Sequence, residues 1–278
     1  MIRAVVTIVL ATLAEASRRR ILLATLLLGV AFVILFSVGI TFAQAEMVRE
    51  GDSPLQRPLV LGMLTLAGLY AVNFLTVITA AFLPVDTLSG EIASGVMQTV
   101  ASKPIHRGTI VFGKWLAHVI VLVGYVLLIG GGVILAARLI TGILPPNVHL
   151  GLTFLVLEGL TVLTVSIAAG TRVSTIANGI ICVGLYGIAF LGGWFEQIGT
   201  FAGLGSASTI GTVASLIFPS EAMWQLAAYS MQPAIARDLQ LTPLSPVSVP
   251  SPLMVVWTVG YVIAMLAFAF RSFARRSL

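Results

Sequence analysis

One stretch of the sequence matches the phosphate-binding loop of ATPases. Residues 108–114 read Gly-Thr-Ile-Val-Phe-Gly-Lys, which fits the pattern G-x-x-x-x-G-K. That chemistry needs a Ser or Thr directly after the lysine to hold magnesium, and this chain has Trp115 there. The glycines also stand at the start of a long apolar run instead of following a strand. We therefore expect no nucleotide site on this chain, so that an ATP-driven function would need a second polypeptide.

Other reactive side chains show no catalytic spacing. The histidines, which stand at His106, His118 and His149, form no H-E-x-x-H or other metal-ligand pattern. No G-x-S-x-G nucleophile motif is present. The single cysteine, Cys182, lies in an apolar run and excludes an internal disulfide. We predict that the chain is not an enzyme and that it holds no metal or cofactor.

Two polar residues fall inside long apolar runs. Glu158 is the one acid well inside such a run, and Asn73 lies in an earlier one. An ionisable group in a membrane is costly, so Glu158 should face the interior of a helix bundle or a partner. Two interpretations stay open for both residues: a polar contact in a transport path or subunit seam, and a structural hydrogen bond.

The composition indicates a membrane protein. Hydrophobic residues make up 58% of the 278 residues and charged residues 9%, against about 25% charged in a soluble domain. We expect one membrane domain, residues 1–278, with no separate soluble domain. The net charge of +5 comes from basic residues scattered at the ends of apolar runs, which membrane orientation explains better than nucleic acid.

Six runs are long enough to cross a bilayer, which takes about 20 apolar residues in a helix. We predict the spans Ile21–Phe42, Leu59–Pro84, Thr109–Ala137, Leu150–Thr171, Val173–Phe195 and Leu253–Phe270. The fold class is therefore an all-α polytopic membrane protein.

A helix precedes the first span, within residues 1–19. Its apolar residues recur at helical spacing: Ile2, Val5, Val6, Val9, Leu10 and Leu13. A signal peptide is the alternative, because Ala14-Glu15-Ala16 resembles a cleavage site. The basic run Arg18–Arg20 argues against export of this point, so we predict a helix lying in the membrane plane.

Residues 197–220 are uncharged and offer a seventh span, which we reject. They contain four glycines and many Ser and Thr residues. With six spans, all but four of the 15 Lys and Arg residues fall on the side of the N-terminus; the exceptions are Arg49, Arg57, Arg138 and Arg237. A seventh span would move the basic C-terminus across the membrane, against the positive-inside rule. Residues 196–252 then form an outer segment with re-entrant or interfacial helices.

The polar segment 86–107 joins the second and third spans. Side-chain oxygens that favour a helix start come from Asp86, Thr87 and Ser89. Apolar residues then recur on one helical face: Ile92, Val96, Met97 and Val100. Pro104 ends the helix, because the residue before a proline is disfavoured in helical conformation. Such an amphipathic helix at the end of a membrane hairpin indicates either a docking surface or ordinary contact with lipid headgroups.

This segment resembles the cytoplasmic loop of type-2 ATP-binding-cassette (ABC) exporter permeases. The likeness rests on Asp86-x-x-Ser89-Gly90-Glu91-x-x-x-Gly95, Ser102-Lys103-Pro104-x-x-Arg107, Gly113-Lys114 and residues 218–224. Within that group the chain is most similar to the single-domain permeases related to the one that serves nitrous-oxide reductase maturation. The resemblance implies an elbow helix at the N-terminus and re-entrant helices between the fifth and sixth spans.

The resemblance also implies the site. Residues 89–102 would form a coupling helix that docks a cytoplasmic ABC ATPase, with Glu91 as its principal polar contact. The docking residues would be Asp86, Ser89, Gly90, Glu91, Gly95, Gln98, Lys103, Arg107 and Arg172. ATP and magnesium would bind the ATPase. A second permease copy or a homologue would form a dimer, with the first, second and fifth spans at the seam.

Localisation and cargo follow from the same family. We expect a bacterial or archaeal cytoplasmic (inner) membrane, with both termini cytoplasmic and the lipid bilayer around the spans. The implied function is export powered by the ATPase, and the likeness admits a periplasmic accessory protein that receives the cargo. The alternative is a stand-alone transporter or channel driven by an ion gradient, which would need more ionisable groups inside the spans.

Overall fold

The computed structural model describes residues 2–51, 56–97, 106–233 and 248–276. In these ranges the chain folds into helices joined by turns. They are α1 (Ile2–Ala16), α2 (Arg20–Glu50), α3 (Gln56–Phe82), α4 (Ser89–Ala93), α6 (Arg107–Thr141), α7 (Val148–Gly170), α8 (Thr175–Phe201), α9 (Gly205–Ile217), α10 (Ser220–Met231) and α12 (Pro252–Ala274).

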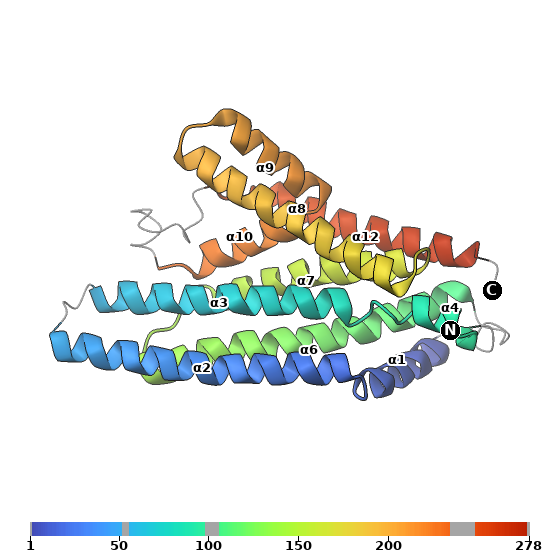
Figure 1. Ribbon diagram of the computed structural model, residues 1–278, viewed down its shortest axis with the longest axis horizontal. Helices are drawn as coiled ribbons and strands as arrows, with labels where there is room; N and C mark the ends of the chain where they lie inside the picture. Colours follow the sequence, from blue (N-terminus) through green and yellow to red (C-terminus); the bar gives the residue numbers. More distant parts are fainter. Residues whose placement is uncertain (1, 52–55, 98–105, 234–247, 277–278) are drawn as a thin grey trace.

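The long helices run along one common direction, as Figure 1 shows. Helices α2, α3, α6 and α7 lie side by side, α12 lies along α7, and α8 leans away from them with α9 folded back against it. Helices α1 and α4 and both chain termini lie at the same end of the bundle, here called the terminal end. The end of α2, the start of α3 and the turn from α6 to α7 lie at the other end, here called the far end.

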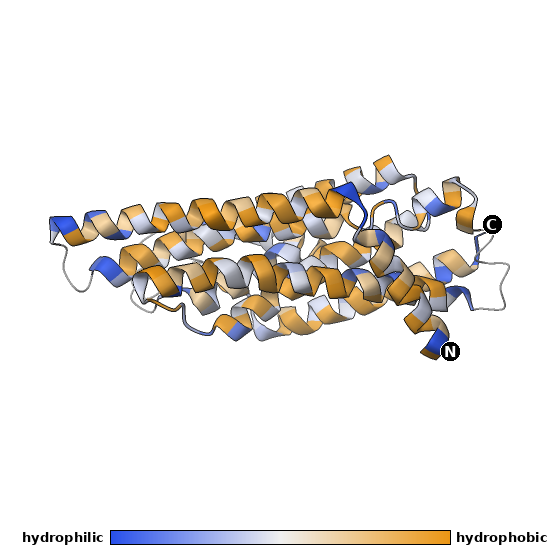
Figure 2. Cartoon of the chain, turned by 90° about the horizontal axis from the view of Figure 1, so that it is seen from below, coloured by the Kyte–Doolittle hydropathy of each residue, from blue (hydrophilic) through white to orange (hydrophobic). Residues whose placement is uncertain are grey.

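Six helices are long and apolar enough to cross a membrane. These helices, α2, α3, α6, α7, α8 and α12, correspond to the six predicted spans, so the predicted fold class is confirmed. Figure 2 shows hydrophobic residues along most of their length. Large apolar side chains such as Leu27, Leu35 and Leu139 are exposed on the outside of the bundle. In a bilayer this surface faces lipid, which replaces the burial that a soluble protein would need.

Helix α1 packs against the first turns of α6 and lies at an angle to α2 (Figure 1). Gly113 of α6 leaves room for Ile8, whose Cγ2 would lie 2.7 Å from an added Cβ. The buried face of α1 carries Val9, Thr12 and Ala16. Ile2, Val6 and Leu10 of the predicted apolar stripe are exposed, so the helix has a second apolar face that is free to contact lipid.

The rejection of a seventh span is confirmed, because residues 197–217 belong to two different helices. Helix α8 continues to Phe201, and after a turn α9 runs back along α8 for 13 residues, fewer than the about 20 that crossing requires. Close contact comes from glycines, since a Cβ on Gly211 would clash with the backbone of Gly192 and Glu196.

Helix α10 lies inside the bundle, packed against α7 (Figure 1). The sequence predicted re-entrant or interfacial helices in this segment. The structure agrees with the re-entrant form, because most of α10 is buried in the bundle, including Met223 and Trp224. Gly151 of α7 allows this approach, because the Met231 side chain occupies the space that a Cβ would take. Hence α9 and α10 form a helical hairpin that enters the bundle from the far end.

Candidate functional site

The predicted coupling segment lies at the terminal end, between α3 and α6. Its first helix, α4, ends at Ala93, and Gly95 follows with a φ of +77°. The prediction of one continuous helix over residues 89–102 was therefore wrong. The left-handed backbone of Gly95 interrupts the helix, and helical backbone resumes at Val96 and Met97. Gln98, Val100 and Lys103 lie outside the described residues.

The side chains predicted to cap α4 bond to other helices instead. Leu88 precedes the helix, and no side chain caps it. Ser89 Oγ donates to Val85 O at 2.8 Å and lies 2.9 Å from Thr175 Oγ1. Thr175 Oγ1 donates to Asp86 Oδ1 at 2.9 Å. These contacts join the start of α4 to Thr175, the first residue of α8. Side chains that could have capped α4 are thus used in tertiary contacts.

Glu91 forms an ion pair with Lys114 of α6, and the two side chains are only 15% and 8% exposed. The pair joins the middle of α4 to the beginning of a long helix. Glu91 was predicted as the principal contact to an ATPase, and in this structure its carboxylate is already engaged within the chain. A buried pair of this kind fixes an orientation more than it adds stability.

The turn between α1 and α2 reaches the region around the start of α4 through Arg19. Arg19 Nη2 donates to Glu15 at 2.5 Å, and Arg19 Nη1 lies 3.9 Å from Asp86 Oδ2. Burial raises the pKa of Glu15, and the hydrogen bond and charge of Arg19 more than offset this, so the pKa lies below its usual value. Thr87 adds a contact at 3.2 Å to the buried His118 of α6. Contacts from α6, from α8 and from Arg19 in the turn before α2 therefore hold the start of α4 and the turn that precedes it.

The other predicted basic residues contact the C-terminal helix. Arg172, in the turn between α7 and α8, donates through Nε to Ser272 Oγ of α12 at 2.6 Å. Arg107 Nη1 donates to the carbonyl oxygen of Arg276 at 2.6 Å. Arg276 in turn donates to the carbonyl oxygen of Thr171. Arg172 and Arg107 thus flank the end of α12, at the same end of the bundle as α4.

The predicted intramembrane residues, Asn73 and Glu158, meet in the centre of the bundle. With the amide nitrogen facing the acid, Asn73 Nδ2 donates to Glu158 Oε1 at 2.9 Å and also to Oε2. Both residues are buried, Glu158 completely. The two residues are therefore hydrogen-bonded to each other, as the structural interpretation expects, and a role in a transport path or subunit seam stays a prediction.

Sequence reasoning missed a second acid beside this pair. Glu221 of α10 is buried and lies close enough to interact electrostatically with Glu158. Gly193 of α8 leaves room for it, since the Glu221 Cγ would lie 2.5 Å from an added Cβ. Glu221 Oε2, Gln225 and the Tyr186 hydroxyl have no hydrogen-bond partner among the described residues. Glu221 was assigned to the outer segment, because its burial depends on α10 entering the bundle.

A match to a protein-family model decides the identity. The model of the ABC-2 family transporter protein matches residues 6–278. The chain belongs to this family. A comparison with characterised proteins found no significant match. This ABC-2 family chain is accordingly a multi-pass membrane permease subunit of an ABC transporter, and the family implies an ATPase partner.

Lys114, which lies in the stretch that matches the phosphate-loop pattern, pairs with Glu91 of α4. Among the described residues, no group of three or more His, Cys, Asp or Glu side chains is placed to hold a metal ion. The region around α4 thus presents a short helix whose end is exposed and whose beginning contacts neighbouring helices.

Proposed function

We propose that this permease is the membrane subunit of an ATP-driven exporter and that α4 is the element on which a cytoplasmic ATPase acts. The observation that supports this most directly is a contrast between the two ends of this segment. The end of α4 and the residues after it are open, with Ala93 and Ser94 exposed and Val96 51% exposed. The beginning of α4 and the turn before it are tied to α6, to α8 and to Arg19 by the contacts of Asp86, Ser89 and Glu91.

Such an arrangement can transmit a displacement of α4 to the helices of the bundle. A partner that pushes the tip of α4 moves its base, and the ion pair of Glu91 with Lys114 passes that displacement to the 35-residue helix α6. The contact between Ser89 and Thr175 passes it to α8. A ligand shifts a conformational equilibrium only through differential interaction with the two states, and closure of an ATPase on ATP would supply that difference.

The basic residues at the terminal end also support an orientation of the chain in the membrane. Helix α4, both termini and the basic residues near them, Arg18, Arg20, Arg271 and Arg275, lie together at the terminal end. Basic residues favour the cytoplasmic side, so we place both termini in the cytoplasm of a bacterial or archaeal cell. The finer likeness to the maturation permease, its cargo and an accessory protein outside the membrane remain predictions.

A second permease copy would pair along α8. Gly184 and Gly187 of α8 have open space where a Cβ would stand, and Ile176, Ile180 and Val183 beside them are exposed. A cavity of about 640 Å³ lies between this face and the end of α3. Small residues let membrane helices approach closely, which supports a seam that includes the second and fifth spans.

Co-purification tests the docking role. The permease is expressed with the ATPase from its own operon, and the readout is ATPase bound per permease. We expect wild type to retain the ATPase and Val96→Asp to lose most of it, because the change places a charge on the exposed tip. Arg49→Glu, an equally exposed change at the far end, is the control. A wild-type permease that retains no ATPase, with or without nucleotide, would overturn the proposal.

A further inference from the structure

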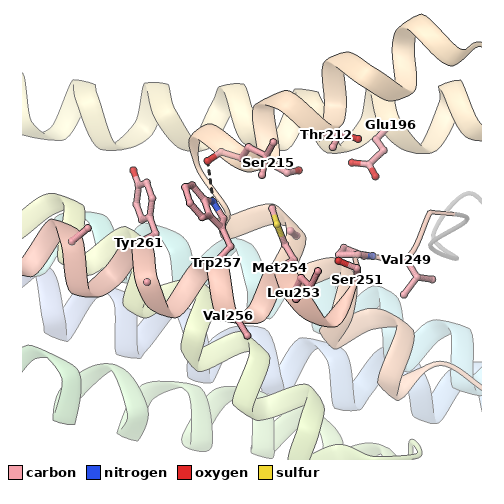
Figure 3. A pocket seen from close by; sticks show the side chains of 15 residues that line it. Glu196, Thr212, Ser215, Val249, Ser251, Leu253, Met254, Val256, Trp257 and Tyr261 are labelled. Atoms are coloured by element: carbon pink, nitrogen blue, oxygen red, sulfur yellow. Dashed lines mark hydrogen bonds between the residues drawn. The ribbon is translucent and has the colours of Figure 1, made fainter.

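A groove opens on the side of the bundle between α9, α10 and α12. Figure 3 shows it at close range, and its volume is about 780 Å³. Apolar side chains line most of it, among them Leu216, Met254, Trp257 and Tyr261. Leu253 and Val256 at its rim are exposed on the outer surface of the bundle. In a bilayer this rim faces lipid, so a ligand would enter from the side.

The groove has the length of one leaflet. Its lining on α12 runs from Leu253, at the start of the helix, to Ala264. At 1.5 Å per residue that stretch measures about 16 Å. The hydrocarbon core of a bilayer is about 30 Å thick, so the groove spans about half of it. One alkyl chain lying parallel to α12 fits these dimensions.

The walls are held in place by the protein itself. Trp257 Nε1 donates to the carbonyl oxygen of Leu216 at 3.1 Å, which fixes the indole between α12 and α9 (Figure 3). Tyr261 meets Phe218 edge to face, with ring centroids 6.3 Å apart. Gly260 adds depth because nothing lies within 4 Å of the position of its missing Cβ. The groove is therefore preformed.

The end of the groove beside the start of α12 is polar and negatively charged. Glu196 of α8 lines this end and is only 9% exposed. Its Oε1 accepts a hydrogen bond from Ser248 Oγ at 2.7 Å, and no Lys, Arg or His in the described part of the chain forms an ion pair with it. Ser215 of α9, on the same side of the groove, is 4% exposed, and its hydroxyl has no hydrogen-bond partner among the described residues. A largely buried carboxylate that has no cationic partner in the described part of the chain is suited to pair with a cation of a ligand.

We propose that this groove binds an amphiphile that has a protonated amine headgroup and an alkyl chain. The ammonium group pairs with Glu196 and donates to the Ser215 hydroxyl, and the chain lies along α12 against Trp257. Anionic amphiphiles are repelled by Glu196, and neutral ones leave it unpaired. The site is a property of the permease alone and goes beyond the proposed ATPase coupling, so either proposal can fail without the other.

Quenching of Trp257 fluorescence tests the site. Purified permease in zwitterionic nanodiscs, without any ATPase, is titrated with an alkylamine that carries a nitroxide on its chain, and with the matched fatty acid and fatty alcohol. The Trp257 signal is the difference between wild type and Trp257→Phe. We expect the amine to bind at least about tenfold more tightly than the alcohol, as expected for one partly buried charge pair, and the acid most weakly.

Two variants separate the headgroup site from the chain site. Glu196→Gln should remove the preference for the amine while the alcohol binds as before. Gly260→Phe should fill the groove and weaken all three amphiphiles. Gly124→Phe is its matched control, because Gly124 of α6 also has open space at its Cβ position but lies outside the groove.

Three results would overturn the proposal. Equal quenching by amine, alcohol and acid would mean ordinary contact with surrounding lipid. An amine preference that persists in Glu196→Gln would place the charge recognition elsewhere. Unchanged quenching in Gly260→Phe would mean that the chain does not enter the groove, and this variant keeps the test valid if Glu196→Gln fails to fold.

Discussion

Lys114 of α6 and Glu91 of α4 form an ion pair at the terminal end of the bundle, shielded from solvent by the surrounding helices. The pair changes what a mutation of Glu91 reports. Charge reversal at Glu91 alone would place two cations together and disturb α4, whether or not Glu91 touches an ATPase. A cleaner experiment keeps the ion pair and exchanges the two charges between positions 91 and 114.

We expect Glu91→Lys to lower ATPase binding strongly and the double variant Glu91→Lys with Lys114→Glu to restore most of it. Breaking one partner of a buried pair costs about 3–5 kcal/mol, and the swap removes that cost. The measurement is ATPase retained per permease, with the permease yield in membranes as control. If the swap folds and still binds no ATPase, Glu91 contacts the ATPase directly instead of positioning α4.

The Asn73–Glu158 contact predicts different effects for two substitutions of the acid. Glu158→Leu leaves the buried Asn73 amide without a partner, and an unsatisfied buried polar group costs about 1–3 kcal/mol. Glu158→Gln keeps a hydrogen-bonding side chain of the same shape and should change stability far less. Unfolding in mixed detergent micelles, followed by tryptophan fluorescence, measures both.

The two interpretations of Glu158 then separate. A stable Glu158→Gln variant that has lost transport would favour a polar contact in the transport path. Equal destabilisation by Gln and Leu would contradict the hydrogen-bond account of the Asn73 contact.

The contact between α8 and α9 depends on Gly211. A Cβ there would clash with the backbone oxygen of Gly192 and would lie 2.8 Å from the backbone nitrogen of Glu196, neither of which a rotamer change relieves. We expect Gly211→Ala to lower the free energy of unfolding by about 1–3 kcal/mol through overpacking. Gly205→Ala on the same helix is the control, because its Cβ would meet open space. Equal stability of the two variants would show that α9 does not pack on α8 in this way.

The proposed seam along α8 predicts a cross-link. In a Cys182→Ala background, Gly184→Cys should form a disulfide-linked dimer in native membranes on mild oxidation, because Gly184 faces open space on the exposed side of α8. The native thiol is buried and is replaced only to remove ambiguity. Gly124→Cys on α6 is the matched control and should stay monomeric on denaturing gels. Cross-linking at Gly124 with none at Gly184 would move the seam to another face.

Local pattern predicted the spans well. Each predicted span overlaps one long helix, although α2 runs on through polar residues to Glu50 and α8 to Phe201. The match is good because a membrane helix satisfies its own backbone, so its length and hydrophobicity appear directly in the sequence. The rejection of a seventh span came from the glycines of residues 197–220 and from the placement of basic residues along the chain, and the 13-residue α9 agrees with it.

The polar contacts were harder to predict. Ser89 and Asp86 were expected to cap α4, and the structure instead gives their side chains to Thr175, 89 positions from Asp86 along the chain. Local propensity suggests a cap, but a partner from a distant segment competes for the same oxygen atoms. The left-handed Gly95 likewise shortened a helix whose apolar spacing continues past it.

The sequence by itself determined a six-span membrane protein with a helix before the first span and a polar segment after the second. Hydrophobic length and charge placement are properties of contiguous residues, so no contact needs to be known. Only the tertiary structure decided that α10 lies inside the bundle, that Glu221 is buried near Glu158, and that Glu196 ends an apolar groove. Each of these depends on helices far apart in sequence meeting in space, which single-segment patterns do not encode.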